Sequence, residues 1–154
     1  MDVKIVERTA TPWVGFHLVG PFEETAPEGF TRLTAWAGQQ GISGEWMGIY
    51  HGNPNKVAAS QLEIDTVIGV EADFDLLPAA ENGPHKGVLA GGKYAVARVI
   101  VEDGDFAKHW LTLFEQWLPT SGWQVDDRPC FDHYLNDGSQ SGVWDVDLYI
   151  PVKK

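Results

Sequence analysis

The feature that most constrains this fold is a strand pattern that occurs twice. The two segments are "LEIDTVIGV" at 62–70 and "WDVDLYIPV" at 144–152. Because successive side chains of an extended chain point to opposite faces, each segment has one apolar and one acidic face. The apolar face of the second segment consists of Trp144, Val146, Leu148 and Ile150. An acidic face of this kind is typical either of a strand exposed to water on one side or of a ligand cavity floored by carboxylates.

The two segments align without a gap, and their acidic faces coincide. The aligned pairs are Glu63 with Asp145, Asp65 with Asp147, and Val67 with Tyr149. Chance similarity between two short amphipathic strands is one explanation. The other is an internal duplication, which predicts that the preceding elements also correspond.

The preceding elements do correspond, at a displacement of about 80 positions. We expect two helices, each with an apolar stripe. One covers residues 25–40 and begins with a capping box of Thr25 and Glu28, and the other runs from residue 105 to Pro119. Strand-like segments surround both helices, so the order strand, helix, strand, strand occurs twice. Trp13 matches Tyr94, and Tyr50 matches Tyr134.

This order predicts an α+β fold made of a duplicated strand-helix-strand-strand module. We expect one domain over residues 1–154, with one half at about 1–75 and the other at about 86–154. Each half would contribute an antiparallel sheet and a helix. A pseudo-symmetric pair of halves leaves a cleft at the seam, where ligand pockets are favoured.

Charge limits the partners of this chain. The 154 residues carry 22 Asp and Glu against 11 Lys and Arg, a net charge of −11. Such a field repels a phosphate backbone and an anionic membrane surface, so we expect neither direct nucleic-acid nor membrane binding. A basic protein or a cationic small molecule suits it better.

Cysteine and histidine usage argue against cofactors and metals. Cys130 is the single cysteine, which excludes an internal disulfide and favours a reducing compartment. The five histidines have no ligand spacing, so we expect no metal and no cofactor. We also expect no secretory signal and no membrane helix, and therefore a cytoplasmic protein.

With these residues in view, the chain resembles the SbmC-type DNA gyrase inhibitors of the GyrI-like family. The resemblance spans nearly the whole chain in order. It is carried by "VGFHLVGPFEETAPEGFTRL" at 14–33, "EWMGIYHGNP" at 45–54, "DTVIGV" at 65–70, "GGKYAVARV" at 91–99, "DFAKHW" at 105–110, and "PCFDHYLNDG" through "WDVDLYIPV" at 129–152.

The resemblance implies the effector-binding-domain fold of multidrug-sensing regulators. In those relatives a groove between the halves accepts bulky, often cationic aromatic compounds, with an acidic residue on the final strand and aromatic walls. The matching acid here is Asp147. Many relatives carry Glu at this position, so the carboxylate here is one methylene shorter. No DNA-binding helical segment precedes residue 1, so we expect no transcription regulation by this chain alone.

The predicted ligand-binding residues combine carboxylates with rings that supply cation–π attraction. They are Asp147, Asp65, Tyr134, Tyr149, Tyr50 and Trp13. The alternative for the two acids is a solvent-facing position or an ion pair with Lys93 or Arg98. Cys130 follows a proline inside a strand, which is typical of a packed thiol.

Two functions fit these residues and the resemblance. The first is binding of amphipathic or cationic small molecules, with modulation of DNA gyrase or protection against gyrase-directed or DNA-damaging toxins. Contact with gyrase would use acidic loops such as 71–82 and 102–105. The alternative is a hydrolase that opens strained rings of cyclopropane-bearing genotoxic compounds, with Asp147 as the catalytic acid or base. A detached sensor module of a regulator is a third interpretation.

Overall fold

The computed structural model describes residues 2–52, 56–76, 83–138 and 140–154. The chain forms two compact units, one of residues 9–90 and one of residues 1–8 together with 91–154. They are called here the 9–90 unit and the 91–154 unit. Residues 77–82 of the acidic loop proposed for gyrase contact lie outside the described residues.

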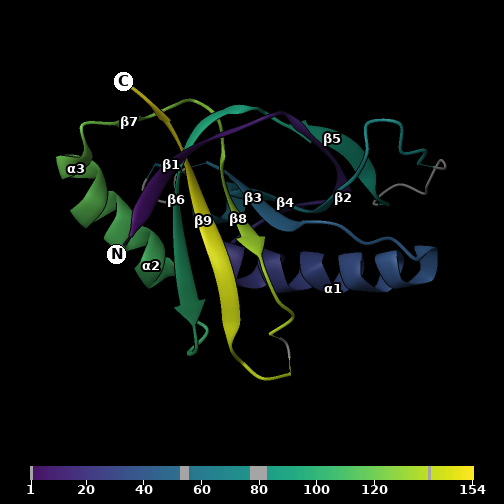
Figure 1. The fold of residues 1–154 in the computed structure, drawn as a ribbon. Coiled ribbons are helices and arrows are strands. Elements are labelled where there is room, and N and C mark those ends of the chain that lie inside the picture. The colour runs from purple at the N-terminus through teal and green to yellow at the C-terminus, as the bar shows by residue number, and fades with distance from the viewer. Residues whose placement is uncertain (1, 53–55, 77–82, 139) are drawn as a thin grey trace. The chain divides into compact units, whose positions relative to one another are not determined.

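The 9–90 unit packs one long helix against an antiparallel sheet (Figure 1). Its elements are β2 (Thr11–Val19), α1 (Phe22–Gln40), β3 (Trp46–His51), β4 (Glu63–Gly69) and β5 (His85–Leu89), with a 3-10 turn at Ala59–Gln61 before β4. β4 pairs with β3 on one side and β2 on the other, and β5 pairs with the free edge of β2.

The helix α1 begins three residues earlier than the predicted capping box. Its N-cap is Pro21, and the Thr25 hydroxyl donates to the Pro21 carbonyl at 3.1 Å instead of capping a backbone N–H. The capping-box prediction is therefore wrong. Gly41, with φ of 66°, ends the helix in the left-handed conformation that glycine adopts without strain.

The apolar face of the 9–90 sheet packs against α1. The buried residues of this core are Phe16, Leu18, Leu33, Ala37, Ile64 and Ile68. The backbone approach is close at Gly29 of α1, where a Cβ would lie 2.5 Å from the Thr66 methyl group of β4. Asp65 alternates with Ile64 and Thr66, so it lies on the face of β4 opposite the helix.

The 91–154 unit has the same strand pairing with different flanking elements. Its strands are β1 (Val3–Arg8), β6 (Gly92–Val101), β7 (Gln124–Val125), β8 (Cys130–Tyr134) and β9 (Trp144–Lys153). β9 pairs with β6 on one side and with β8 and β7 on the other, and β1 pairs with β6. The expected first half contained residues 3–8, but here they extend the sheet of the 91–154 unit.

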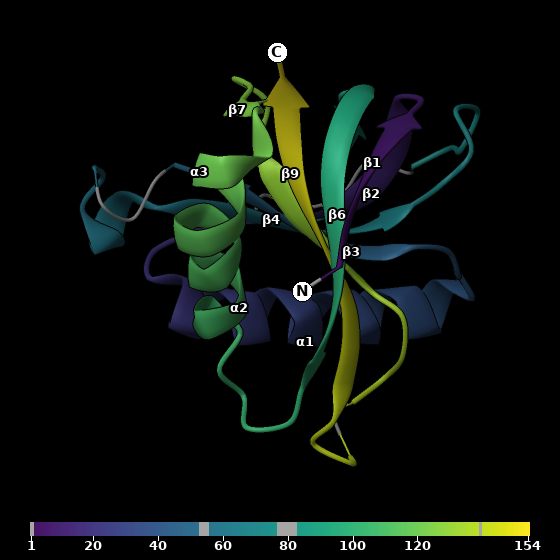
Figure 2. The ribbon, with the colours of Figure 1, turned by 60° about the vertical axis from the view of Figure 1, so that its left-hand side comes forward.

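The second helical region continues through the proline that was expected to end it. It consists of α2 (Ala107–Thr112), a π-helical turn (Leu113–Trp117) and α3 (Leu118–Ser121), and Gly122 with φ of 80° ends it. Pro119 has no backbone N–H to donate. It lies near the start of α3, directly after the π-helical turn, where the lack of this donor is tolerated. Figure 2 shows α2 and α3 beside the long β6–β9 pair.

These helices cover one face of β6 and β9. Leu113 packs there with Val99, Val146, Leu148 and Ile150 in a buried core. Asp147 and Tyr149 alternate with those core residues and lie on the opposite face. No helix among the described residues is long and apolar enough to cross a membrane.

The observed elements confirm the predicted α+β class, and strand, helix, strand, strand occurs in both units. The strands β1, β5 and β7 were not predicted from the sequence. In each unit the last of the four core elements, β4 or β9, lies between the other two core strands. Origin by duplication, the boundaries of the halves and the cleft at their seam stay predictions.

Candidate functional site

Each unit holds one nearly buried carboxylate at the matching position of its last core strand. Asp65 of β4 and Asp147 of β9 both expose 7% of their surface and lie on the helix-free face. Near the two acids this face is not open to water, because Val67 beside Asp65 is fully buried and Tyr149 beside Asp147 is 8% exposed. What differs between the units is the group that pairs with the carboxylate.

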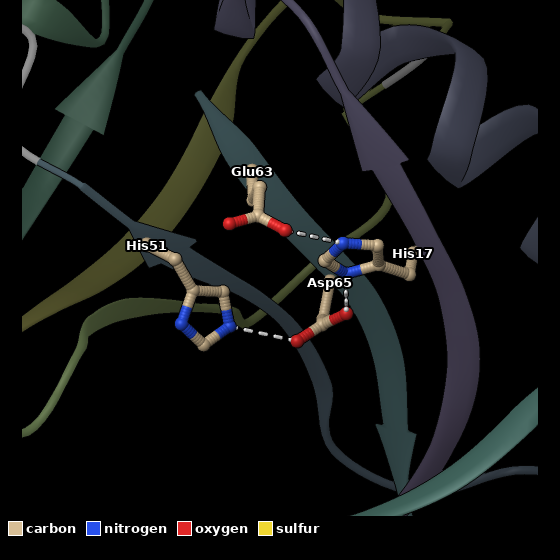
Figure 3. A network of polar contacts seen from close by, with 4 residues as sticks. All are labelled: His17, His51, Glu63 and Asp65. Atoms are coloured by element: carbon tan, nitrogen blue, oxygen red, sulfur yellow. Dashed lines mark hydrogen bonds and ion pairs between the residues drawn. The ribbon is translucent and has the colours of Figure 1, made fainter. Parts of the chain in front are cut away.

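In the 9–90 unit two imidazoles hold Asp65, and Figure 3 shows the arrangement. His17 Nδ1 lies 2.7 Å from Asp65 Oδ1, and His51 Nε2 lies 2.8 Å from Asp65 Oδ2. The second nitrogen of His17 lies 3.0 Å from Glu63 Oε1. His17, His51, Glu63 and Asp65 are called here the imidazole cluster. The three strands β2, β3 and β4 supply its members.

Strand register explains why the imidazole cluster forms. His17 is the direct antiparallel partner of Asp65, and His51 is the direct partner of Glu63. Directly opposite residues project to the same face with Cβ atoms about 5 Å apart. The alternating sequence thus brings four titratable side chains together without any ligand-like spacing along the chain.

The electrostatics of the cluster favour charged forms of His17 and Asp65. Burial lowers the pKa of His17, but hydrogen bonds and charge from Asp65 and then Glu63 outweigh it, so its pKa lies above the usual 6.5. Burial raises the pKa of Asp65, but the hydrogen bonds from His51 and His17 outweigh it, so this pKa lies below 3.8. A proton on His17 therefore balances the charge of Asp65 up to a higher pH than an ordinary imidazole would.

In the 91–154 unit an arginine holds Asp147. Arg98 Nε donates to Asp147 Oδ1 at 2.9 Å, and Nη2 donates to Oδ2 at 3.1 Å. Arg98 of β6 is the direct strand partner of Asp147, as His17 is of Asp65. The hydrogen bonds and charge of Asp147 raise the pKa of Arg98 above its usual value. This ion pair is the one that the sequence analysis gave as the alternative to ligand binding.

Beyond Asp147 on the same face lies a cluster of three rings, Tyr94, Phe131 and Tyr149, called here the aromatic stack. Phe131 and Tyr149 are parallel within 10° with centroids 4.2 Å apart, and Tyr94 meets Phe131 edge-on at 5.2 Å. The guanidinium carbon of Arg8 is 5.3 and 5.2 Å from the two parallel rings. Such equal distances place Arg8 beside the pair, where its Nη1 donates to the Tyr149 hydroxyl at 3.4 Å.

A second arginine covers the remaining ring of the stack. Arg128 lies 4.5 Å from the centroid of Tyr94. Its guanidinium donates to the carbonyls of Gly91 and Lys93 and to Asp126. The two arginines of this unit therefore already supply cations to the rings that a cationic ligand would use.

The other predicted ring residues divide between the two faces. Trp13 shares the face of Asp65 and lies over Gly87, where a Cβ would meet the ring at 2.2 Å. Tyr50 and Tyr134 lie on the helix-facing sides of their units, where Tyr50 packs edge-on against Phe22 at 5.0 Å. Tyr134 contacts Phe106 and Trp144 there. Within their units, neither tyrosine is brought beside the acid it was predicted to accompany.

The thiol of Cys130 is not an activated nucleophile. Burial raises the pKa of the Cys130 thiol to about 12, so this side chain stays protonated near neutral pH. Within the described part of the chain, no group of three or more His, Cys, Asp or Glu residues is arranged to hold a metal ion.

Sequence reasoning missed His17, His51, Phe131 and Arg8 as members of these clusters. His17 and Arg98 occupy matching positions before their acids, and that correspondence is the signal that identifies His17 as a partner. Arg8 and Tyr149 are 141 positions apart, and no local pattern connects them.

Comparison with known proteins places this chain in a family. The family model described as GyrI-like small molecule binding domain matches residues 1–153. A protein of Erwinia billingiae named DNA gyrase inhibitor is 55% identical over 154 residues, which cover 100% of this chain and 99% of that protein.

Solved structures share the fold at low sequence identity. The EcmrR C-terminal domain has a TM-score of 0.72 at 12% identity, covering 99% of this chain and 98% of that one. SAV2435 bound to tetraphenylphosphonium has a TM-score of 0.60 at 13% identity, covering 99% and 94%. Together with the full-length family match, these findings show that the chain belongs to the GyrI-like small molecule binding domain family.

Proposed function

We propose that this protein modulates DNA gyrase and binds amphipathic or cationic aromatic small molecules, protecting the cell against gyrase-directed or DNA-damaging toxins. The observation that carries the gyrase part is the 55% identity, over both full lengths, to a protein named DNA gyrase inhibitor. Gyrase acts on DNA in the cytoplasm, so the proposal includes a cytoplasmic location.

The small-molecule part rests on the family match and on the helix-free faces. Each face carries a nearly buried carboxylate, Asp65 or Asp147, and an aromatic side chain, Trp13 or Tyr149. A bound organic cation would gain charge pairing from the acid and cation–π attraction of about 0.5 to 2 kcal/mol from a ring. The proposed ligand-binding residues are therefore Asp147, Asp65, Tyr149 and Trp13, and roles for Tyr50 and Tyr134 stay predictions.

The hydrolase alternative stays a prediction with a specific demand on Asp147. Both carboxylate oxygens accept hydrogen bonds from Arg98. To serve as a general base, Asp147 must accept a proton from water on an oxygen lone pair that the bonds from Arg98 leave free.

A supercoiling assay with purified gyrase tests the first part. We expect this protein to reduce supercoiling of relaxed plasmid in a concentration-dependent way. Asp103→Asn in the acidic loop 102–105 tests the proposed contact, and Arg32→Gln on the exposed side of α1 serves as the surface control. Full gyrase activity in the presence of excess protein would overturn the gyrase part.

A thermal-shift titration tests the second part. Tetraphenylphosphonium should raise the melting temperature in proportion to the logarithm of its concentration above Kd. Tetraphenylborate, which has the same shape and the opposite charge, should not. Equal shifts with both ions would show that charge pairing with the carboxylates does not contribute, and no shift with either ion would overturn small-molecule binding of this class.

A further inference from the structure

The two carboxylates differ in whether their partner can lose its charge. Arg98 keeps its proton at every physiological pH, because a guanidinium stays charged in proteins and the pairing with Asp147 raises its pKa further. His17 is an imidazole, and 39% of its side chain is exposed to water. A ligand cation that approaches Asp147 must displace a permanent cation, whereas one that approaches Asp65 has to displace a proton.

The hydrogen bonds of the imidazole cluster indicate which ring nitrogens carry protons. Both ring nitrogens of His17 face carboxylate oxygens, at 2.7 and 3.0 Å, so the doubly protonated ring satisfies both contacts. His51 Nε2 donates to the other Asp65 oxygen. With His17 charged, the side chains of His17, Glu63 and Asp65 together carry one net negative charge. Loss of the His17 proton leaves two negative charges, and a bound monovalent cation returns the total to one.

We propose that Asp65, rather than Asp147, is the carboxylate that pairs with an organic cation, and that binding releases the proton held by His17. The inference rests on the proposed small-molecule function and specifies its site and its pH dependence. The proton leaves His17 for solvent, the imidazole becomes a neutral acceptor, and the freed Asp65 oxygen faces the cation. Half-exposed imidazoles on either side of Asp65 provide the access that a rigid bidentate arginine would block.

Other titratable groups lie on the strands that border His17. β4 supplies Asp65 and Glu63, and β3 supplies His51. β5 begins with His85, which pairs with Gly15 two residues before His17 and is exposed. His85 has no contact with the cluster among the described residues, so it serves as the matched control histidine.

Calorimetry with tetraphenylphosphonium tests the proposal, because this cation does not titrate. The binding enthalpy is measured at pH 6.5 in two buffers of different ionisation enthalpy, and the difference counts the protons released. We expect a release that approaches one proton per bound cation. Affinity should then rise with pH by up to about tenfold per pH unit while His17 of the free protein is protonated, and should level off once His17 has lost its proton.

Variants of His17 test whether the released proton comes from this residue. His17→Gln should bind the cation with no proton release and no pH dependence, and His17→Arg should weaken binding by reproducing the Arg98 arrangement. His85→Gln should behave like the natural protein. His17→Asn provides a second neutral substitution if His17→Gln fails to fold, and the proton count of the natural protein requires no variant.

The outcomes separate the two proposals. Cation binding without proton release, or release that persists in the His17 variants, would overturn the exchange at His17 and leave small-molecule binding intact. Binding that is lost in Asp147→Asn and retained in Asp65→Asn would overturn the choice of Asp65. If the cation does not bind at all, both the small-molecule function and the exchange fail.

Discussion

The 9–90 and 91–154 units pair their strands in the same way and place a carboxylate at the same position, yet they stabilise that carboxylate differently. Asp65 accepts hydrogen bonds from two imidazoles, and Asp147 accepts two from one guanidinium. The rings near Asp147 form a tight stack, whereas Val67 occupies the position of Tyr149 beside Asp65. The common fold determines where the carboxylate lies. The partner determines whether the net charge of the pair changes as the partner titrates.

The largest expected effect tests whether the aromatic stack is a structural support of the 91–154 unit. Phe131→Ala should lower the free energy of unfolding by about 3–5 kcal/mol, because it removes a fully buried ring and its contacts with Tyr94 and Tyr149. Urea denaturation measures the loss. Phe131→Leu keeps more of the volume and should lose less. A loss below about 1 kcal/mol in Phe131→Ala would contradict this role.

A smaller effect is expected at the start of β6. Gly92 has φ of 137°, and a Cβ there would lie 2.6 Å from the Arg128 guanidinium. Gly92→Ala should therefore cost about 1–3 kcal/mol through backbone strain and displacement of Arg128 from Tyr94. Thermal unfolding measures it. Thr11→Ala at the matching start of β2 is the control, since Thr11 already carries a Cβ; an equal loss in both variants would argue against the strain.

The next prediction concerns the permanent ion pair. Arg98→Gln should lower stability because it leaves the nearly buried Asp147 without its bidentate partner. The loss should be the same at pH 6 and pH 9, since Arg98 is protonated at both. Denaturation at the two pH values measures this. A loss that disappears at pH 9 would show that another group, which titrates in this range, balances Asp147.

The smallest expected effect is the pH-dependent one. His17→Gln should lower stability less than Arg98→Gln, because His51 still donates to Asp65. Folding raises the pKa of His17, so its contribution is complete below the unfolded value of 6.5 and is lost as pH rises through the higher folded value. The stability difference between the natural protein and His17→Gln should shrink from pH 6 to pH 9. A difference that grows with pH would reverse the assigned sign.

The architecture was easier to predict from the sequence than the site. Strand and helix patterns are local in the chain, whereas the contacts of the site join residues that are far apart in sequence. Alternation within β4 and β9 predicted that Asp65 and Asp147 lie opposite the apolar face of their strands, and the order of strands and helices predicted the α+β class. The strands β1 and β5 were missed since they are short, partly exposed edge strands with weak alternation. Their pairing depends on β6 and β2, which are distant in sequence.

The partners of the two acids were predictable only in part. Arg98 was proposed as a partner of Asp147, and the contact is present. A single histidine inside an apolar strand, such as His17, carries no signal by itself and gains one only when the strands are set in register. The arginines Arg8 and Arg128 reach the aromatic stack from segments that flank the core elements, and no periodicity describes such contacts.

The pairing of β1 with β6 affects the order in which the two units can fold during synthesis. All strands of the 9–90 unit are available to one another once Ala90 has left the ribosome, whereas β1, which is made before them, must wait for β6. β9 is translated after the other strands of the 91–154 unit, so that sheet is completed only after all strands of the 9–90 unit have been made. The residues of β1 are therefore made before the 9–90 unit but acquire their native neighbours after that unit can fold.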